Sequence, residues 1–356
     1  MSKNATSPSI LTVDLGALSA NYRLLQSMTN ADVAGVIKAD GYGCGAVPVF
    51  RALRKAGCGT FFVATPDEAI QLRETDSGAQ IMVLGGLYEG AEDFYAGRGI
   101  IPVLNSMDEC RRWAKTAGTF GQVLPAVLNY DTGMNRLGLA PNDLPETRTF
   151  DLRLVMSHFA CSDEKGHAMN ERQAAAFERI ASVYPKAYKS LCNSSAIFRN
   201  RKWHYDLVRP GYALFGGNPT PEAKNPMKRV VSLKTRILQV RDVKQGETAG
   251  YSATHVFHKP TRTATVALGY ADGFLRAGSN KAKLYWGDHP CPIVGRVSMD
   301  LIIVDIGHLA EHPQAGEWLE VLGPHQGVDD LARDCGNIGY EILTSLGPRH
   351  MRVYER

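Results

Sequence analysis

The sequence predicts an α/β protein with an N-terminal (β/α)8 TIM-type barrel and a C-terminal mainly-β domain. Eight short apolar runs alternate with amphipathic segments between Ala34 and Val208, as in repeated βα units with parallel strands. After Gly216 the pattern changes to β-rich runs broken by Gly, Pro and Asp, which is typical of an antiparallel domain. A doubly wound open sheet would share the first alternation, but eight units favour the barrel.

The elements can be taken in chain order. The run Ile10–Asp14 alternates like a strand, which we expect to pack either with the barrel or with the C-terminal domain, and Asp14 can cap the helix that follows. The runs predicted as barrel strands are Ala34–Lys38, Gly59–Ala64, Ile81–Leu84, Ile101–Leu104, Val123–Leu128, Leu152–Met156, Ala187–Cys192 and Tyr205–Val208. Helices are predicted near Val47–Lys55, from Pro66, and near Ala91–Ala96, Met107–Ala114, Asn170–Val183 and Ser195–Asn200.

The second part of the chain is predicted to be mostly strands. Its expected strands are Val230–Val240, Thr263–Leu268, Lys283–Trp286, Pro292–Val297, Leu301–Ile306 and Trp318–Leu322, with helices at Asp329–Cys335 and Tyr340–Leu346. We therefore expect a barrel domain over residues 10–225 and a β domain over residues 226–356.

Composition excludes several classes of protein. A length of 356 residues, 44% hydrophobic and 21% charged, is ordinary for a globular protein. The net charge of +4 is not gathered into a run, and the cluster Arg199–Lys202 is typical of a solvated helix end, so no nucleic-acid partner is expected. No apolar stretch approaches ~20 residues, so no membrane partner is expected either. The seven cysteines are scattered without a CxxC, as in a reduced, cytoplasmic protein.

Lys38 is the first candidate for chemistry. It ends an apolar run, and Gly41, Gly43 and Gly45 follow it. A lone lysine there is usually a solvated strand end. The alternative is a Schiff-base lysine, whose amine must be partly desolvated so that its pKa falls and the neutral form can attack an aldehyde.

Other polar residues follow later barrel strands, where the active site of such a barrel lies. These segments are Asn129–Arg136, Ser157–Ala160, Cys192–Ser195 and Arg209–Tyr212. Taken singly, His158 could be a core histidine, Asn193 a turn former and Gly211 a bend. Together they indicate a site at the barrel mouth. Cys161 and His167 match no zinc spacing, so no metal is expected.

The motifs together resemble those of the alanine racemase family, from about residue 10 to the C-terminus. The motifs that carry this resemblance are Val36–Gly43, Tyr130–Met134, Asn193–Ser195, Arg209–Gly211, Gly250–Ser252, Gly269–Gly273 and Gly295–Asp300. The resemblance implies covalent pyridoxal 5′-phosphate (PLP), alanine as substrate, and a head-to-tail homodimer in which each active site borrows residues from the partner's β domain.

The resemblance also implies residue roles. The catalytic residues would be Lys38, Tyr251, His158 and Arg209. Those that bind the cofactor would be Lys38, Tyr42, His158, Asn193, Ser194, Arg209, Gly211 and Tyr212. Those that bind the substrate would be Arg136, Met299, Tyr270 and Asp300. Lys38 and a partner's Tyr251 would serve as the two bases, one on each face of the substrate Cα, with the phenol tuned by His158. Arg209 would face the pyridine nitrogen. Because a guanidinium is permanently charged and cannot take up a proton, this contact would leave the nitrogen unprotonated.

Two departures from the family pattern stand out. Many members have a carbamylated lysine where this chain has Asn129, so we expect an anion such as chloride beside Asn129 and Arg136. The family's second phosphate-binding tyrosine has no counterpart in Ser345–Arg349.

Other functions fit parts of the pattern. A racemase of wider range, or one for serine, lysine or arginine, would share the motifs. A decarboxylase of the same fold is a further alternative, but the chain shows no cysteine or acidic motif for the partner-derived face, where Tyr251 is the better candidate. A PLP-binding homeostasis protein would lack the second domain. The sequence does not decide between a biosynthetic role, supplying D-alanine for cell-wall peptidoglycan, and alanine catabolism.

Overall fold

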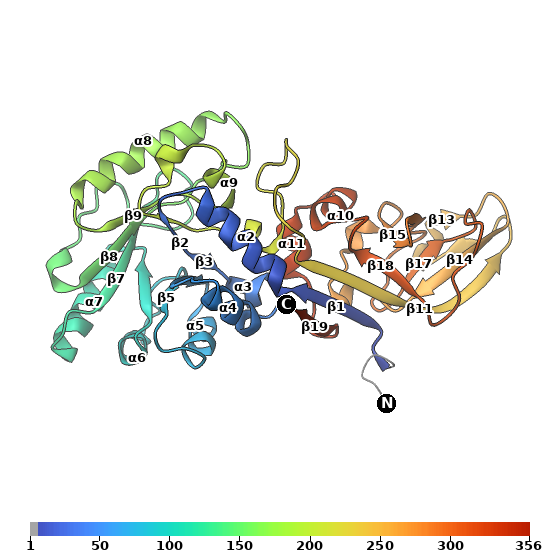
Figure 1. Ribbon diagram of the computed structural model, residues 1–356, viewed down its shortest axis with the longest axis horizontal. Coiled ribbons are helices and arrows are strands. Elements are labelled where there is room, and N and C mark those ends of the chain that lie inside the picture. Colours follow the sequence, from blue (N-terminus) through green and yellow to red (C-terminus); the bar gives the residue numbers. More distant parts are fainter. Residues whose placement is uncertain (1–5) are drawn as a thin grey trace. The chain divides into compact units, whose positions relative to one another are not determined.

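The computed structural model describes residues 6–356 (Figure 1). The chain divides into two compact units. One comprises residues 18–228, and the other joins the described residues up to 17 to residues 229–356. Within residues 6–356, no helix has the length and apolar character needed to cross a bilayer.

The first unit contains a parallel sheet in chain order. Its seven strands are β3 (Gly35–Val36), β4 (Thr60–Val63), β5 (Gln80–Val83), β6 (Ile101–Leu104), β7 (Pro125–Asn129), β8 (Asp151–Met156) and β9 (Tyr188–Ser190). β10 (Leu207–Val208) pairs in parallel with β2 (Asp32–Val33). The Arg209 N–H donates to the Cys192 carbonyl at 2.9 Å, which links the β10 segment to the β9 segment. The ladder therefore runs through eight segments and returns to its start, as predicted.

Helices follow most of these strands. They are α2 (Leu15–Ser27), α3 (Lys38–Tyr42), α4 (Ala46–Lys55), α5 (Pro66–Arg73), α6 (Glu92–Arg98), α7 (Met107–Phe120), α8 (Ala168–Val183) and α9 (Ser194–Ile197). Short 3₁₀ turns lie at Thr147–Thr149, Arg201–Trp203 and Tyr212–Phe215. Strand side chains form a hydrophobic core whose buried members are Ala34, Val36, Phe62, Met82, Ile101, Val103, Val127, Leu154, Met156 and Leu207. A filled interior of this kind leaves the strand ends as the place for chemistry.

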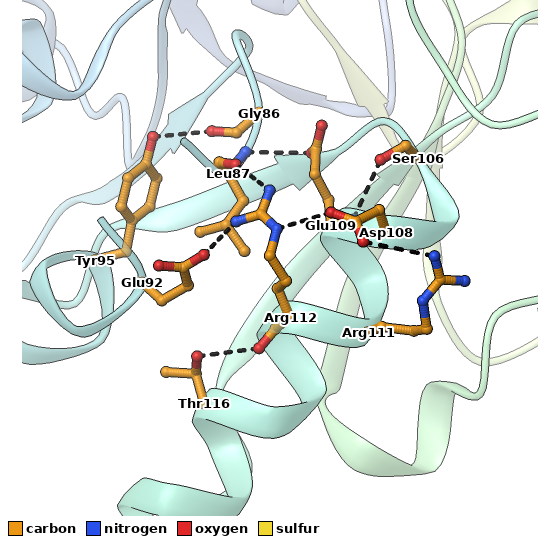
Figure 2. A network of polar contacts seen from close by, with 10 residues as sticks. All are labelled: Gly86, Leu87, Glu92, Tyr95, Ser106, Asp108, Glu109, Arg111, Arg112 and Thr116. Carbon is orange, nitrogen blue, oxygen red and sulfur yellow. Dashed lines mark hydrogen bonds and ion pairs between the residues drawn. The ribbon is translucent and has the colours of Figure 1, made fainter. Parts of the chain in front are cut away.

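A polar network holds two of the loops at this end of the barrel (Figure 2). The Glu109 carboxylate accepts the backbone N–H groups of Leu87 at 3.2 Å and Asn105 at 3.0 Å. Arg112 donates to the Leu87 carbonyl at 2.8 Å and forms an ion pair with Glu92. The loops after β5 and β6 are thereby fixed to α7 and α6.

The second unit is built on a twisted β-sheet. Its path runs β16 (His289–Pro292), β15 (Lys283–Trp286), β18 (Trp318–Leu322), β11 (Val231–Val243), β1 (Ser9–Asp14) and β19 (Met351–Glu355), and β14 (Thr261–Val266) pairs with β11 and β17 (Ile302–Asp305). Further elements are β12 (Thr248–Ala249), β13 (His255–Val256), α10 (Val328–Asp334), α11 (Gly339–Thr344) and 3₁₀ turns at Tyr251–Ala253, Tyr270–Asp272 and Arg276–Gly278. The first strand thus belongs to this sheet, between β11 and β19.

The predicted fold class is confirmed, but some element predictions were wrong. A strand expected at Pro292–Val297 lies instead at His289–Pro292, where Gly287 with φ +59° allows the tight turn between β15 and β16. β12, β13 and β19 were not predicted. The first two are only two residues long, and β19 mixes apolar with charged residues, none of them buried, so no continuous apolar run or regular alternation marks them.

Candidate active site

Lys38 stands at the end of β3 and opens a left-handed turn. Ala39, Asp40, Gly41 and Tyr42 all have φ between +53° and +61°, and the Gly41 N–H donates to the Ile37 carbonyl at 2.9 Å. For a non-glycine residue this conformation costs about 1–2 kcal/mol. The predicted break after Lys38 is therefore present, but it depends on more than its glycines. Strain of this kind gathers at functional sites.

The surroundings of Lys38 favour its neutral amine. The side chain is half-buried. Burial, and next the positive charge of Arg136, lower the pKa of Lys38, while the carboxylate of Glu68 raises it. The condition that the sequence analysis set for a Schiff-base lysine, a desolvated amine with a lowered pKa, is met.

A cluster of hydrogen-bond donors lies beyond β9 and β10. The Ser194 hydroxyl accepts the N–H groups of Gly211 and Ala213, each at 3.1 Å. The phenol of Tyr42 lies against Gly211, where a β-carbon would be 2.2 Å from the phenol oxygen. The Tyr42 ring also stacks on Phe215 with centroids 4.7 Å apart. Two amides, a hydroxyl and a phenol meet around a residue without a side chain, which fits the phosphate of PLP.

Asn193 and Tyr212 flank this group of donors. The Asn193 side chain caps α9, since its Oδ1 accepts the Ala196 N–H at 3.1 Å and the Ser162 hydroxyl at 2.7 Å. Asn193 therefore acts as a cap that fixes Ser194. The Tyr212 ring lies against Gly217, where a β-carbon would be 2.1 Å from the ring.

Arg209 is a buried cation with neutral partners. Its guanidinium donates to the Ser190 hydroxyl and to the Ser157 carbonyl, and its carbon lies 6.0 Å from the centre of the Phe62 ring. Burial lowers the pKa of Arg209 to about 10, so the side chain stays charged at neutral pH. Sequence reasoning placed Ser157 in the polar segment Ser157–Ala160 without giving it a role, and it missed Ser190, which lies in the predicted strand Ala187–Cys192.

His158 follows β8 and is held neutral. Burial is the largest cause that lowers the pKa of His158, to about 3, and the charges of Arg209, Arg136 and Lys38 add to it. The positive charge of Arg209 thus disfavours protonation of His158. A neutral imidazole can accept a proton or a hydrogen bond from a neighbouring phenol.

Asn129 is tied to the loop that carries Arg136. Its side-chain amide donates to Asn105 Oδ1 at 2.8 Å and to the Leu137 carbonyl at 3.2 Å. Its backbone carbonyl accepts the Leu139 N–H at 2.8 Å. The backbone N–H of Asn105 in turn donates to the Glu109 carboxylate at 3.0 Å. The exposed Arg136 therefore sits on a loop braced by neutral hydrogen bonds, and the anion beside it stays a prediction.

The remaining predicted residues lie in the second unit. Tyr251, Tyr270 and Met299 are exposed, with 71%, 44% and 54% of their surfaces accessible. The Tyr270 N–H donates to the Ser298 carbonyl at 3.1 Å, so Tyr270 and Met299 stand on adjacent turns. Gly269 permits this approach, because a β-carbon there would be 2.1 Å from the Met299 carbonyl oxygen.

An arginine missed by sequence reasoning holds these two turns together. Arg349 pairs through Nε with Asp272 at 3.0 Å and through Nη1 with Asp300 at 2.8 Å. The Asp272 carboxylate also accepts the Gly269 N–H at 2.8 Å. Asp300 thus contacts Arg349 and helps to fix the turn that carries Met299.

Cys161 and His167 lie nearer each other than their spacing suggested. With Glu164 they form a group whose ligand atoms lie within 4.8 Å of one another. His167 Nδ1 already accepts the Met169 N–H at 3.1 Å and caps α8, and Glu164 and His167 are exposed. We assign no metal to this group.

The fold and the barrel mouth define a class: two-unit proteins in which a parallel barrel presents a half-buried lysine with a lowered pKa beside a cluster of hydrogen-bond donors, followed by a β-rich unit. Two family models match in sequence, "Alanine racemase, N-terminal domain" over residues 13–219 and "Alanine racemase, C-terminal domain" over residues 230–354. The chain belongs to the alanine racemase family.

Individual relatives cover nearly the whole chain. An alanine racemase of Methylobacterium nodulans is 46% identical over 97% of this chain and 95% of its own length. A catabolic alanine racemase of Mesorhizobium japonicum is 44% identical over 98% and 94%. The alanine racemase of Bartonella henselae, solved with covalently bound pyridoxal phosphate, superposes with a TM-score of 0.94 at 38% identity, covering 98% of this chain and 99% of that one. The predicted family, enzyme class and PLP dependence are confirmed.

Proposed function

We propose that the protein interconverts L- and D-alanine at the mouth of its barrel, with PLP held covalently on Lys38. The observation that carries the proposal is the half-buried amine of Lys38, whose pKa is lowered by burial and by Arg136. When bound, PLP supplies an aldehyde for amino groups and a ring that withdraws electrons from the substrate Cα. Tyr42, Ser194 and the amides of Gly211 and Ala213 would hold its phosphate.

Arg209 and His158 would tune the chemistry. Arg209 would face the pyridine nitrogen and leave it unprotonated, since its partners are neutral oxygens and its charge is retained. The ring then withdraws fewer electrons, which favours a brief deprotonation and reprotonation over other outcomes. His158, held neutral, would orient and polarise the second base.

The second base would come from another copy of the chain. Lys38 would take or return the Cα proton on one face, and Tyr251 of the partner subunit would do so on the other. The support is the exposure of Tyr251 on a turn whose Ser252 hydroxyl accepts from Arg296 at 2.7 Å. Arg136 and the Met299 N–H would bind the substrate carboxylate, with Tyr270 and Asp300 bordering the approach.

Further parts of the proposal concern the cell and the assembly. We infer a cytoplasmic homodimer with shared active sites. Its barrel domain would span residues 10–225, except that the first strand joins the sheet of the β domain, and its β domain would span residues 226–356. The protein would supply D-alanine either for cell-wall peptidoglycan or for alanine catabolism.

Exchange in D₂O tests the reaction. Purified yellow protein mixed with L-alanine should place deuterium at Cα and yield D-alanine. A PLP carrier would do neither, and a decarboxylase would release CO₂. A parallel screen of L-serine, L-lysine and L-arginine should give slower conversion than L-alanine; faster conversion of one of them would assign that substrate instead.

A further inference from the structure

Glu68 joins two loops of the barrel mouth. It lies in the first turn of α5, where its Oε2 accepts the N–H groups of Ala64 at 2.7 Å and Thr65 at 3.4 Å. That is the role of an acidic residue in a capping box. Its other oxygen, Oε1, accepts the Ala39 N–H at 2.6 Å. The cap needs only one carboxylate oxygen, so the bond to Ala39 is a separate contact with the residue that follows Lys38.

The turn that Glu68 reaches needs such support. Ala39, Asp40 and Tyr42 are non-glycine residues in the left-handed region, which is costly. Inside the turn, the Asp40 carboxylate accepts the Ala46 N–H at 2.7 Å and ties the turn to α4. Glu68 ties the opposite end to the loop between β4 and α5. A hydrogen bond from an amide to a charged carboxylate is among the stronger ones available to a backbone.

Charge points to the same residue. The negative charge of Glu68 opposes the effect of Arg136 on the amine of Lys38. An uncharged hydrogen-bond acceptor at this position could fix the turn, but it would not oppose the lowering of the Lys38 pKa by Arg136. Glu68 therefore acts on both the position and the protonation of that amine.

We propose that Glu68 is a positioning residue, whose carboxylate fixes the Ala39 amide and so determines where the amine of Lys38 lies at the end of β3. This inference rests on the proposed function, in which Lys38 carries the cofactor.

Three variants of the full chain test it. Glu68→Gln removes the charge and sets an amide NH₂ either against the Ala39 N–H or against the N–H groups of Ala64 and Thr65. Glu68→Asp keeps the charge but shortens the reach. Asp67→Asn is the matched control, because Asp67 is an exposed acid in the same helical turn.

The first readout is attachment of PLP to the cofactor-stripped chain, followed by absorbance. It gives the dissociation constant of PLP and the rate of attachment as a function of pH. In Glu68→Gln we expect the dissociation constant to rise at least ~10-fold and the midpoint of the rate–pH curve to move to lower pH, since a negative charge that favours the ammonium is gone. Glu68→Asp should keep the midpoint near that of the wild type while its dissociation constant rises. Asp67→Asn should change neither. A role confined to folding would not move the midpoint.

The second readout is hydrogen exchange of the segment around Ala39. Exchange there should speed up in both Glu68 variants and not in the control. If Glu68→Gln folds as the control does and matches the wild type within about twofold in affinity and exchange, the inference is overturned. If Glu68→Gln does not fold, Glu68→Asp decides, and wild-type affinity in that variant overturns it.

Borohydride reduction followed by peptide mapping separates this inference from the proposed function. PLP fixed on Lys38 in the wild type supports the proposed function whatever the Glu68 variants do. PLP fixed on another lysine overturns the proposed function, and the inference with it.

Discussion

The phenol of Tyr42 occupies the space that a side chain at Gly211 would need: a β-carbon built there lies 2.2 Å from the phenol oxygen. Substituting Gly211 by alanine must displace the phenol or shift the backbone that carries the amides beside Ser194. Crowding of this kind typically costs 1–3 kcal/mol. We expect Gly211→Ala to weaken PLP binding ~10-fold or more, measured by titration of the stripped protein. Gly97→Ala, where a β-carbon meets nothing within 4 Å, is the control and should bind normally.

His158 predicts how stability depends on pH. Its pKa lies near 3 in the folded chain, below its ordinary value, chiefly through burial. Between about pH 6.5 and 3 the unfolded chain binds a proton that the folded chain does not, so unfolding becomes easier as pH falls, by up to about 1.4 kcal/mol per pH unit. Urea unfolding at several pH values should show a shallower acid slope for His158→Gln. The exposed His258→Gln should retain the wild-type slope; equal slopes in all three proteins would contradict the assignment.

Tyr251 predicts an asymmetry between enantiomers. If the phenol serves one face of Cα, Tyr251→Phe should slow exchange of the Cα hydrogen from one enantiomer ~100-fold, the scale of general-base catalysis. Exchange from the other enantiomer should fall much less, because Lys38 still serves it. Deuterium incorporation by mass spectrometry measures both. Tyr188→Phe, at another exposed tyrosine, should leave both rates unchanged, and equal slowing of both enantiomers by Tyr251→Phe would refute the two-base assignment.

Arg136 and Asn129 predict a response to halide. An anion beside the Arg136 side chain should improve its binding of the substrate carboxylate, so KM for alanine should fall as chloride replaces a bulky anion at constant ionic strength. In Asn129→Asp, a fixed carboxylate would take the place of the anion, and KM should lose its dependence on chloride. A wild-type KM that ignores halide would rule out this site.

Arg349 predicts a coupling between stability and substrate binding. Arg349→Met leaves the buried carboxylate of Asp272 without its cationic partner and frees the turn of Asp300. Because Arg349 is half-exposed, we expect only a small loss in the free energy of unfolding, together with a raised KM for alanine. Arg333→Met, at an exposed i,i+3 pair, should do neither. A variant with normal KM would show that Arg349 supports the fold alone.

The barrel was predictable because its pattern is redundant. Each buried strand appears in the sequence as an apolar run, and several of these runs are followed by a polar residue at the same edge of the barrel. Lys38, His158 and Arg209 could therefore be proposed as site residues from the sequence. The C-terminal sheet was harder to predict. β19 joins that sheet by pairing in parallel with β1, more than 300 residues away, and a contact so distant leaves no local pattern.

The conformation around Lys38 shows a different limit. The glycines after Lys38 predict a break in the chain, but Ala39, Asp40 and Tyr42 favour right-handed backbone in isolation, so local preference does not predict that they are left-handed. The left-handed turn instead depends on contacts from Glu68 and Ala46. Arg349 escaped prediction for a similar reason, since its two aspartate partners are 77 and 49 residues away.

The cations Lys38, Arg136 and Arg209, which together depress the pKa of His158, have a consequence for how ligands arrive. Their fields add at the open end of the barrel and attract a phosphate or a carboxylate before any contact is made. Dissolved ions shorten the reach of that attraction to about 8 Å at physiological ionic strength. The capture of anionic ligands should therefore slow as salt concentration rises.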